Sequence, residues 1–433
     1  MKRFLTLLLT FAILFGLIAC QSVDNVAEDT ASDAAADTED TTALQEEPVT
    51  PVVSVCGHDL SEYTAVAYFR SDSDAAIATF VKNFDRICTD AFGFTIPYTV
   101  VSGSSALADA VKENDGKVIA FTPFIKKLGD FPNLDGETAC YGVTESGGIY
   151  VTTAQTLMYS HLFRAFLYET LGVTWEPVVP AKSAALSAFQ READLFSDEM
   201  LSAMGYGLVF DDEFDGDTLS DAWERLGHPD PNQRRVSNGI LELRSEYLTD
   251  GERGETWYTG SIWLKEQYCR GYFEARLKCH EPMKDGFWSA FWIQGPEPYN
   301  PEASLGGIGE GGCEIDILEY FGGSAIQANL YCSGGEDVTS NELDAKHMIY
   351  PYNGDEPFSA DFHTFGLLWD EDCYILQLDG VPYFCTNFCK GTSHVPERVI
   401  FDLAANMNTL NPDQKNHPSV MQVDYMKIWQ KAE

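Results

Sequence analysis

One stretch of the sequence, Cys313-Glu-Ile-Asp-Ile-Leu-Glu-Tyr320, is the most informative about the fold of the chain. Its carboxylates stand among aliphatic residues and glycines border it on both sides, so it predicts one short β-strand. Alternation along a strand places Glu314 and Asp316 on the same face, about 7 Å apart. Glu319 is five positions after Glu314 and would face the other way unless one extra residue forms a β-bulge. We therefore predict a bulge that brings all three acids to one face.

Paired carboxyl groups of this kind suit the hydrolysis of a glycosidic bond. A retaining glycosidase holds two carboxyl groups about 5 to 5.5 Å apart: one attacks the anomeric carbon and the other, still protonated, protonates the departing oxygen. Crowding separates the pKa values of neighbouring acids. A calcium site and a solvated acidic strand remain open as alternatives from the spacing alone. The apolar residues between the acids favour catalysis, because a solvated face does not need them.

At this stretch the sequence resembles glycoside hydrolase family 16, in the laminarinase-like form with a bulged Glu-x-Asp-x-x-Glu signature. Further segments resemble the family in the right order: 208–214, 271–276, 286–295, 361–369, 378–380 and 423–429. The resemblance implies an all-β jelly-roll sandwich of two curved antiparallel sheets. It also implies that Glu314 is the nucleophile, that Glu319 is the acid and then the base, and that Asp316 tunes the pair.

Candidate substrate-binding residues surround the acids. Trp288 and Trp292 share parity on one predicted strand, where flat indoles offer a platform for a sugar ring. The resemblance favours Trp292 as the one nearest the reacting sugar, and one of the two tryptophans is equally well explained as core. Gln294 and Asn406 are candidates for hydrogen bonds to sugar hydroxyls, with ordinary structural roles as the alternative. Tyr331 is a further substrate-binding candidate, at the rim of the cleft.

Two positions depart from the family pattern. Tyr331 stands where laminarinase-like members usually have a histidine, and segment 259–262 lacks an arginine often found there. Both departures bear on the identity of the substrate and not on catalysis.

The resemblance also implies a structural calcium ion away from catalysis. Its ligands would be Glu213, Asp424 and the backbone carbonyl of Gly239, and oxygen donors from separate strands suit calcium. An exposed edge position for Asp424 is the alternative. Catalysis itself requires no cofactor.

The composition of the chain limits the classes of partner that it can bind. With 433 residues, 45% of them hydrophobic, the chain can form two packed domains and a tail. A formal net charge of −39 opposes binding to nucleic acid, whose phosphates require clustered Lys and Arg. It also disfavours acidic polysaccharides, so we expect a neutral polysaccharide substrate and a monomeric protein.

The N-terminus predicts export. Lys2 and Arg3 precede an apolar run, 4–18, which is too short for a membrane span and ends in Leu17-Ile-Ala-Cys20. This resembles a bacterial lipobox, so residues 1–20 are interpreted as a lipoprotein signal peptide with Cys20 as the lipidated residue. An ordinary secretory signal is the alternative. The protein is then lipid-anchored at the bacterial cell surface or in the cell envelope.

The remaining sequence divides into three parts. Residues 21–53 are acidic and lack Lys and Arg, which predicts a disordered tether. Residues 54–205 alternate strand and helix patterns, with a helix over 74–92 and two longer helices near 154–171 and 181–204, and predict a small α/β domain of unknown role. Residues 206–433 change to short strands and turns, which indicates the catalytic sandwich. Ten cysteines besides Cys20 show no regular spacing, and we expect few or no disulfides.

We therefore predict an endo-acting retaining glycosidase for β-1,3 or mixed β-1,3/1,4 glucan of the laminarin or lichenan type. The alternatives are the same fold acting on a β-galactan such as agarose or a mucin-type glycan, and a non-catalytic glycan-binding module. Water and a sugar hydroxyl compete for the same intermediate, so transglycosylation is also open.

Overall fold

The computed structural model describes twelve stretches of the chain: residues 53–70, 73–125, 139–182, 185–226, 231–281, 286–298, 309–322, 325–332, 348–351, 357–387, 391–405 and 415–432. The chain divides into two units, Met1–Val49 and Thr50–Glu433. The predicted signal peptide, Cys20 and the body of the predicted tether lie outside the described residues. Within the described stretches, no helix has both the length and the apolar character needed to cross a membrane.

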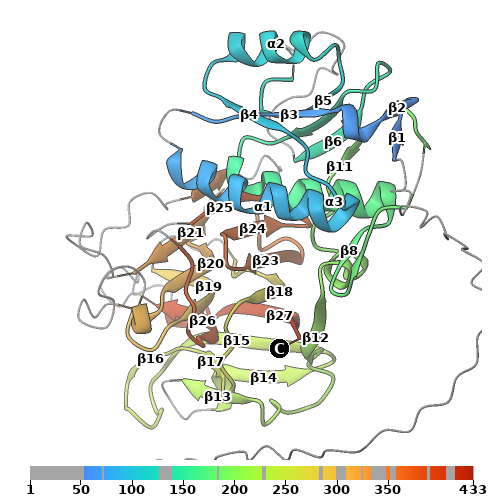
Figure 1. The fold of residues 1–433 in the computed structure, drawn as a ribbon. Coiled ribbons are helices and arrows are strands. Elements are labelled where there is room, and N and C mark those ends of the chain that lie inside the picture. Colours follow the sequence, from blue (N-terminus) through green and yellow to red (C-terminus); the bar gives the residue numbers. More distant parts are fainter. Residues whose placement is uncertain are drawn as a thin grey trace, which may run out of the picture. The chain divides into compact units, whose positions relative to one another are not determined.

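The first part of the described chain is built on a six-stranded sheet (Figure 1). Its strands lie in the order β11 (Phe189–Glu192), β6 (Cys140–Val143), β7 (Ile149–Thr152), β5 (Val118–Phe121), β3 (Thr64–Tyr68) and β4 (Tyr98–Val101). Four neighbours, β7 to β4, pair in parallel, and β6 and β11 extend one edge antiparallel. Crossover helices between the parallel strands explain this arrangement, as the alternation in the sequence predicts.

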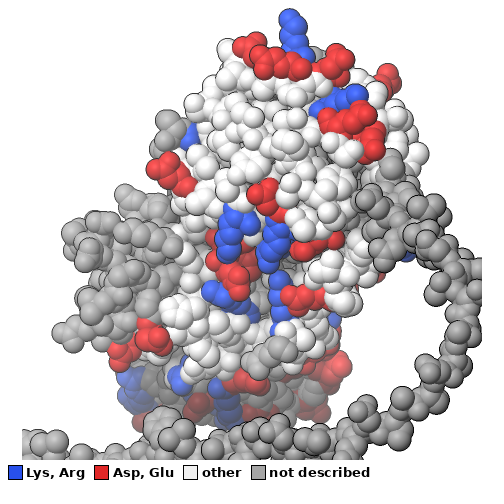
Figure 2. Space-filling view, in the orientation of Figure 1, with Lys and Arg blue, Asp and Glu red and all other residues white. Residues whose placement is uncertain are grey.

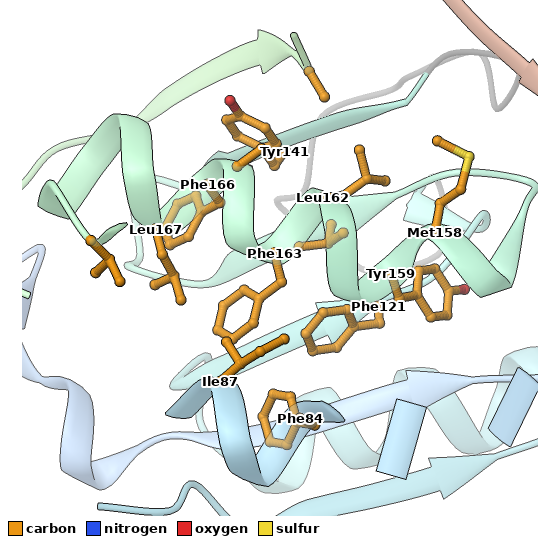
Figure 3. Packing of buried hydrophobic residues seen from close by; sticks show 14 of the residues in the cluster. Phe84, Ile87, Phe121, Tyr141, Met158, Tyr159, Leu162, Phe163, Phe166 and Leu167 are labelled. Atoms are coloured by element: carbon orange, nitrogen blue, oxygen red, sulfur yellow. The ribbon is translucent and has the colours of Figure 1, made fainter. Parts of the chain in front are cut away.

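Helices cover both faces of this sheet. α1 (Asp74–Phe92) and α3 (Tyr159–Leu171) pack on one face, and α2 (Ser104–Glu113) packs on the other with Leu107 and Val111. Figure 3 shows the first of these layers, where Phe84 of α1, Phe163 of α3 and Phe121 of β5 meet with ring centroids 5.4 to 5.7 Å apart. The predicted helix over 74–92 is confirmed.

The predicted helix over 181–204 is wrong. This segment contains two strands, β10 (Ala185–Leu186) and β11, and only a short helix, α4 (Asp198–Ala203). Backbone pairing of β11 with the edge strand β6 outweighs helical propensity there. Ser197 is the N-cap of α4, and its side chain accepts a hydrogen bond from Met200 N at 3.4 Å.

Short elements complete this part. They are β1 (Ser54–Val55), β2 (His58–Asp59), η1 (Leu60–Glu62), η3 (Thr156–Met158), β8 (Thr174–Trp175) and β9 (Val178–Val179).

The second part is a sandwich of two antiparallel sheets. The larger follows the order β14 (Arg234–Ser237), β15 (Ile240–Leu248), β27 (Ser419–Lys431), β18 (Gly271–Lys278), β23 (His363–Trp369), β24 (Tyr374–Leu378) and β25 (Val381–Thr386); β12 (Tyr206–Asp212) also pairs with β27 and β16 (Thr256–Tyr258) with β15. The smaller follows the order β13 (Trp223–Leu226), β17 (Ser261–Leu264), β26 (Arg398–Ala405), β19 (Phe287–Gln294), β20 (Glu314–Tyr320), β21 (Ala325–Tyr331) and β22 (Met348–Pro351). Two single turns, η4 (Pro231–Gln233) and η5 (Gly309–Gly311), precede β14 and β20. The predicted pair of antiparallel sheets is confirmed.

Alternation along the strands assigns each sheet face a role. Phe273, Leu367 and Leu376 of the nine-stranded sheet point into the core between the two sheets. Their neighbours Tyr272, Leu368 and Ile375 belong instead to the core of the α/β part. Phe196, just before α4, stacks on Tyr272 with ring centroids 5.2 Å apart. The α/β part therefore packs on the outer face of the nine-stranded sheet, and the outer face of the seven-stranded sheet is left for the site.

Candidate active site

The central acids lie on β20, and the predicted bulge is present. Trp292 of β19 pairs with Asp316, but the preceding residue of β19, Phe291, pairs with Leu318, so Ile317 is the extra residue. The pairing of β20 with β21 is irregular at the same place, between Asp316 and Glu319. One inserted residue corrects the parity of Glu319, as the sequence predicts.

The acids point away from the core. Ile315, Leu318 and Tyr320 are fully buried between the two sheets. Glu314 and Glu319 are partly exposed, and Asp316 between them is 5% exposed. The bulge therefore lets one strand fill the core with its apolar side chains and present three acids on its other face.

Neighbouring strands supply amides that hold the two glutamates. Gln294 of β19 is paired with Glu314 and donates from Nε2 to Glu314 Oε2 at 3.4 Å. Asn329 of β21 is 3% exposed and donates from Nδ2 to Glu319 Oε2. A donor beside each carboxylate fixes its orientation, so both glutamates are positioned by residues of the adjacent strands.

Electrostatic coupling joins the acids and Tyr331. Burial raises the pKa of Asp316 well above its ordinary value, and the charges of Glu319 and Glu314 raise this pKa further. Burial and the same three acids raise the pKa of Tyr331, which is paired with Glu314, to about 12. Burial and the neighbouring charges therefore favour the protonated form of Asp316, while Tyr331 stays a neutral hydroxyl.

Aromatic residues flank the acids on β19. Trp292 is opposite Asp316, and both Trp292 and Trp288 are half-buried on the face of the acids. Trp288 lies against Phe321, which is 47% exposed, with ring centroids 5.9 Å apart. The structure thus brings together Trp288, Trp292, Gln294 and Tyr331 with the acids. Asn406 lies outside the described residues.

A fourth acid on this face, only partly exposed, was missed from the sequence. Asp402 of β26 is paired across Ala290 with Glu319 and, on its other side, with Ser261, whose Oγ it contacts. Burial raises the pKa of Asp402 to about 6, while the hydroxyl of Ser261 and the charge of Arg234 lower it. Asp402 stands between the buried residues Phe401 and Leu403, as a polar residue does in any half-buried strand. The sequence therefore holds no specific signal that Asp402 belongs to the site.

The residues expected to bind calcium are already paired with cations. Lys427 Nζ lies 2.6 Å from Glu213 Oε1, and an Arg276 guanidinium nitrogen contacts Asp424 Oδ2. Gly239 lies near the backbone oxygen of Glu213. Since both carboxylates have basic partners, these residues do not fit a calcium ion in this arrangement, and calcium stays a prediction.

This architecture defines a class of protein. A sandwich that presents two glutamates and a buried aspartate on one face, beside aromatic side chains, is that of a carboxylate-dependent glycoside hydrolase.

The comparisons with known proteins agree with this class. The model of "Glycosyl hydrolases family 16" matches residues 230–427. A glucan endo-1,3-beta-glucosidase of Cryptopygus antarcticus is 31% identical over 195 residues, which cover 41% of this chain and 67% of that protein. The chain therefore belongs to family 16 of the glycoside hydrolases.

Other similar proteins are more distant. Glucan endo-1,3-beta-glucosidase A1 of Niallia circulans is 22% identical over 268 residues, covering 52% of this chain and 38% of that protein. Among solved structures, SCLam, a non-specific endo-beta-1,3(4)-glucanase, has a TM-score of 0.42 at 21% identity and covers 53% of this chain and 92% of its own. The laminarinase catalytic domain of Thermotoga maritima has a TM-score of 0.42 at 20% identity and covers 53% and 99%.

Proposed function

We propose that the protein is an endo-acting retaining glycosidase that cleaves internal β-1,3 or mixed β-1,3/1,4 bonds of a neutral glucan. The bulge at Ile317 is the observation that carries the proposal, because it gathers Glu314, Asp316 and Glu319 on one accessible face. The names of the relatives from Cryptopygus antarcticus and Niallia circulans support a β-1,3-glucan as substrate. The net charge of −39 supports a neutral one.

The reaction proceeds in two displacements. A carboxylate oxygen of Glu314 attacks the anomeric carbon while the bond from that carbon to the leaving oxygen breaks, and Glu319 gives its proton to that oxygen. Glu319, now ionised, removes a proton from water, and the water oxygen displaces Glu314 from the anomeric carbon. Burial and the charges of both glutamates favour the protonated form of Asp316, which limits the negative charge that the three acids share.

Activity on defined glucans tests the proposal. We expect the wild type to release oligosaccharides from laminarin and barley β-glucan, and Glu314→Gln and Glu319→Gln each to lose at least about 1,000-fold in kcat because each removes a reacting group. Glu199→Gln, an exposed acid of α4, serves as a matched control that keeps full activity. Wild-type activity in Glu314→Gln would end the assignment.

The first product distinguishes the mechanism and the class of substrate. Two displacements retain the anomeric configuration, so NMR during the first minutes should show the β-anomer before mutarotation. A panel with agarose and a mucin-type glycan tests the galactan alternative, which the departure at Tyr331 keeps open because that residue is paired with Glu314. Binding to all glycans without cleavage would instead favour a glycan-binding module.

We also propose that the protein is exported and held at the cell surface or in the envelope by a lipid on Cys20. The support is the sequence pattern that ends at that cysteine. Labelling of expressing cells with a fatty-acid analogue should mark the wild type and leave Cys20→Ala unlabelled. Equal labelling of both proteins would exclude this anchor. We expect a monomer by light scattering.

A further inference from the structure

A polar pocket lies where the α/β part meets the nine-stranded sheet, away from the catalytic acids. Its volume is about 400 Å³, within the range of small-molecule sites. The cations that line it are Arg86, Arg164, Arg270 and Lys431. We propose that this pocket binds a small anion with a carboxylate or phosphate group, held by the guanidinium of Arg164.

Arg164 is a buried cation that forms no ion pair with a described residue, although the charges of Asp370 and Asp372 act on it from a distance. It lies on α3, is 8% exposed, and makes no hydrogen bond or ion pair with any residue that the structure describes. Its Nε is buried and unpartnered within the same stretches. The contact found for its guanidinium is the ring of Trp175, 5.2 Å from the centroid. Burial of an unpaired charge is costly, and a bound oxyanion would offset that cost through paired hydrogen bonds.

Other cations crowd the same place. Burial lowers the pKa of Arg164 and the charge of Arg86 lowers it further, while Asp370 and Asp372 raise it in part. Burial also lowers the pKa of Lys431, followed by the charge of Arg164. Arg86 donates to the neutral amide oxygen of Asn83 at 3.1 Å. Like charges that depress one another's pKa values gain most from an anion placed among them.

Four acids line the pocket, and each has a partner other than Arg164. Glu371 lies 3.4 Å from Arg270, and Glu176 lies 4.0 Å from Lys431. Asp370 Oδ2 lies 2.7 Å from His161 Nε2, and Asp370 Oδ1 accepts two backbone N–H bonds. Asp372 accepts from Asn83 at 2.6 Å and from Lys82 at 3.1 Å. None of these bonds involves Arg164. The acids leave Arg164 unpaired and would repel a polyanion, so the occupant is a small anion.

The surface shows the same mixture of charges. In Figure 2, Lys and Arg atoms gather around acidic ones at the middle of the face in view. In a chain with a net charge of −39, cations gathered in this way are a local feature of the surface.

A metal ion is the competing occupant of this region. His161, Asp370 and Cys373 each offer a ligand atom, and these atoms lie within 4.8 Å of one another. Arg164 lies about one turn after His161 on α3. The charge of Asp370 raises the pKa of both Arg164 and Lys431, so both cations act on the same acid. These positive charges oppose a divalent cation and favour an anion.

Binding by the full chain tests the inference. Calorimetry and thermal melting would be measured with inorganic phosphate, with glucuronate and with neutral glucose, all at constant ionic strength. We expect saturable binding of phosphate or glucuronate and none of glucose; whichever anion saturates at the lower concentration identifies the group. Arg164→Met should weaken binding at least tenfold and Arg86→Gln about threefold or more. Arg191→Gln, an exposed arginine that pairs with Glu169 outside the pocket, should change it less than twofold.

Several outcomes would overturn the inference. They are the absence of saturable binding by both anions, unchanged affinity in Arg164→Met or, if that variant does not fold, unchanged affinity in Arg86→Gln. Stoichiometric zinc in the purified protein without anion binding would also assign the region to a metal. In ligand-free buffer Arg164→Met should melt no lower than the wild type, because it removes an unpaired buried charge; a purely structural arginine would lower the melting temperature.

Discussion

Replacing Glu397 by glutamine should stabilise the protein at pH 7 by about 3 kcal/mol. Glu397 is fully buried and accepts a hydrogen bond at 2.8 Å from the backbone N–H of Cys313, the residue just before the acid strand. Burial raises its pKa from 4.5 to about 8. Between these values the unfolded chain is ionised and the folded one protonated, so the unfolded state binds fewer protons and stability falls as pH rises. Glutamine keeps an oxygen that can accept the hydrogen bond from Cys313. It is neutral at every pH, so the cost of protonating a buried carboxylate disappears.

The magnitude follows from the two pKa values. Between pH 4.5 and pH 7 the wild type loses about 1.4 kcal/mol of stability per pH unit, or roughly 3 kcal/mol in all. At pH 5 this loss is under about 1 kcal/mol. Urea denaturation of the wild type and of Glu397→Gln at pH 5, 6 and 7 measures it. Glu310→Gln, an exposed glutamate before the same strand, is the control and should show no such trend. A variant less stable than the wild type by the same margin at all three pH values would refute the reasoning.

Three further predictions concern the site. Asn329→Ala removes the amide that donates to Glu319. Because a hydrogen bond to a charged group contributes about 1.5 to 3 kcal/mol, kcat on laminarin should fall roughly 10- to 100-fold with KM little changed. An unchanged kcat would contradict this role. Asp316→Asn mimics the protonated acid, so its stability at pH 7 should equal or exceed that of the wild type in urea while kcat falls; a large loss of stability would mean that Asp316 is ionised in the folded protein. Because both acids of the expected calcium site are paired with cations, excess EDTA should leave the melting temperature unchanged, whereas a drop that added calcium reverses would restore the calcium site.

Local sequence was sufficient for the acid strand. Alternation fixes the face of each residue, and five positions between Glu314 and Glu319 require one bulge if both are to share a face. The register confirms that bulge at Ile317. The helix over 74–92 was equally predictable, because its apolar period is local and Gly93 ends it in a left-handed conformation.

Tertiary structure alone decided the rest. Phe189–Glu192 become a strand because β6 offers an open edge, which no local pattern reveals. Asn329 and Asp402 reach the acids through pairing between strands distant in sequence, and Arg164 meets Lys431 only where the two parts pack together. The sequence by itself thus determined which face each residue of a strand takes, since that depends on neighbours along the chain. The partners across a sheet or a domain contact depend on the folding of the whole chain, so only the structure identified them.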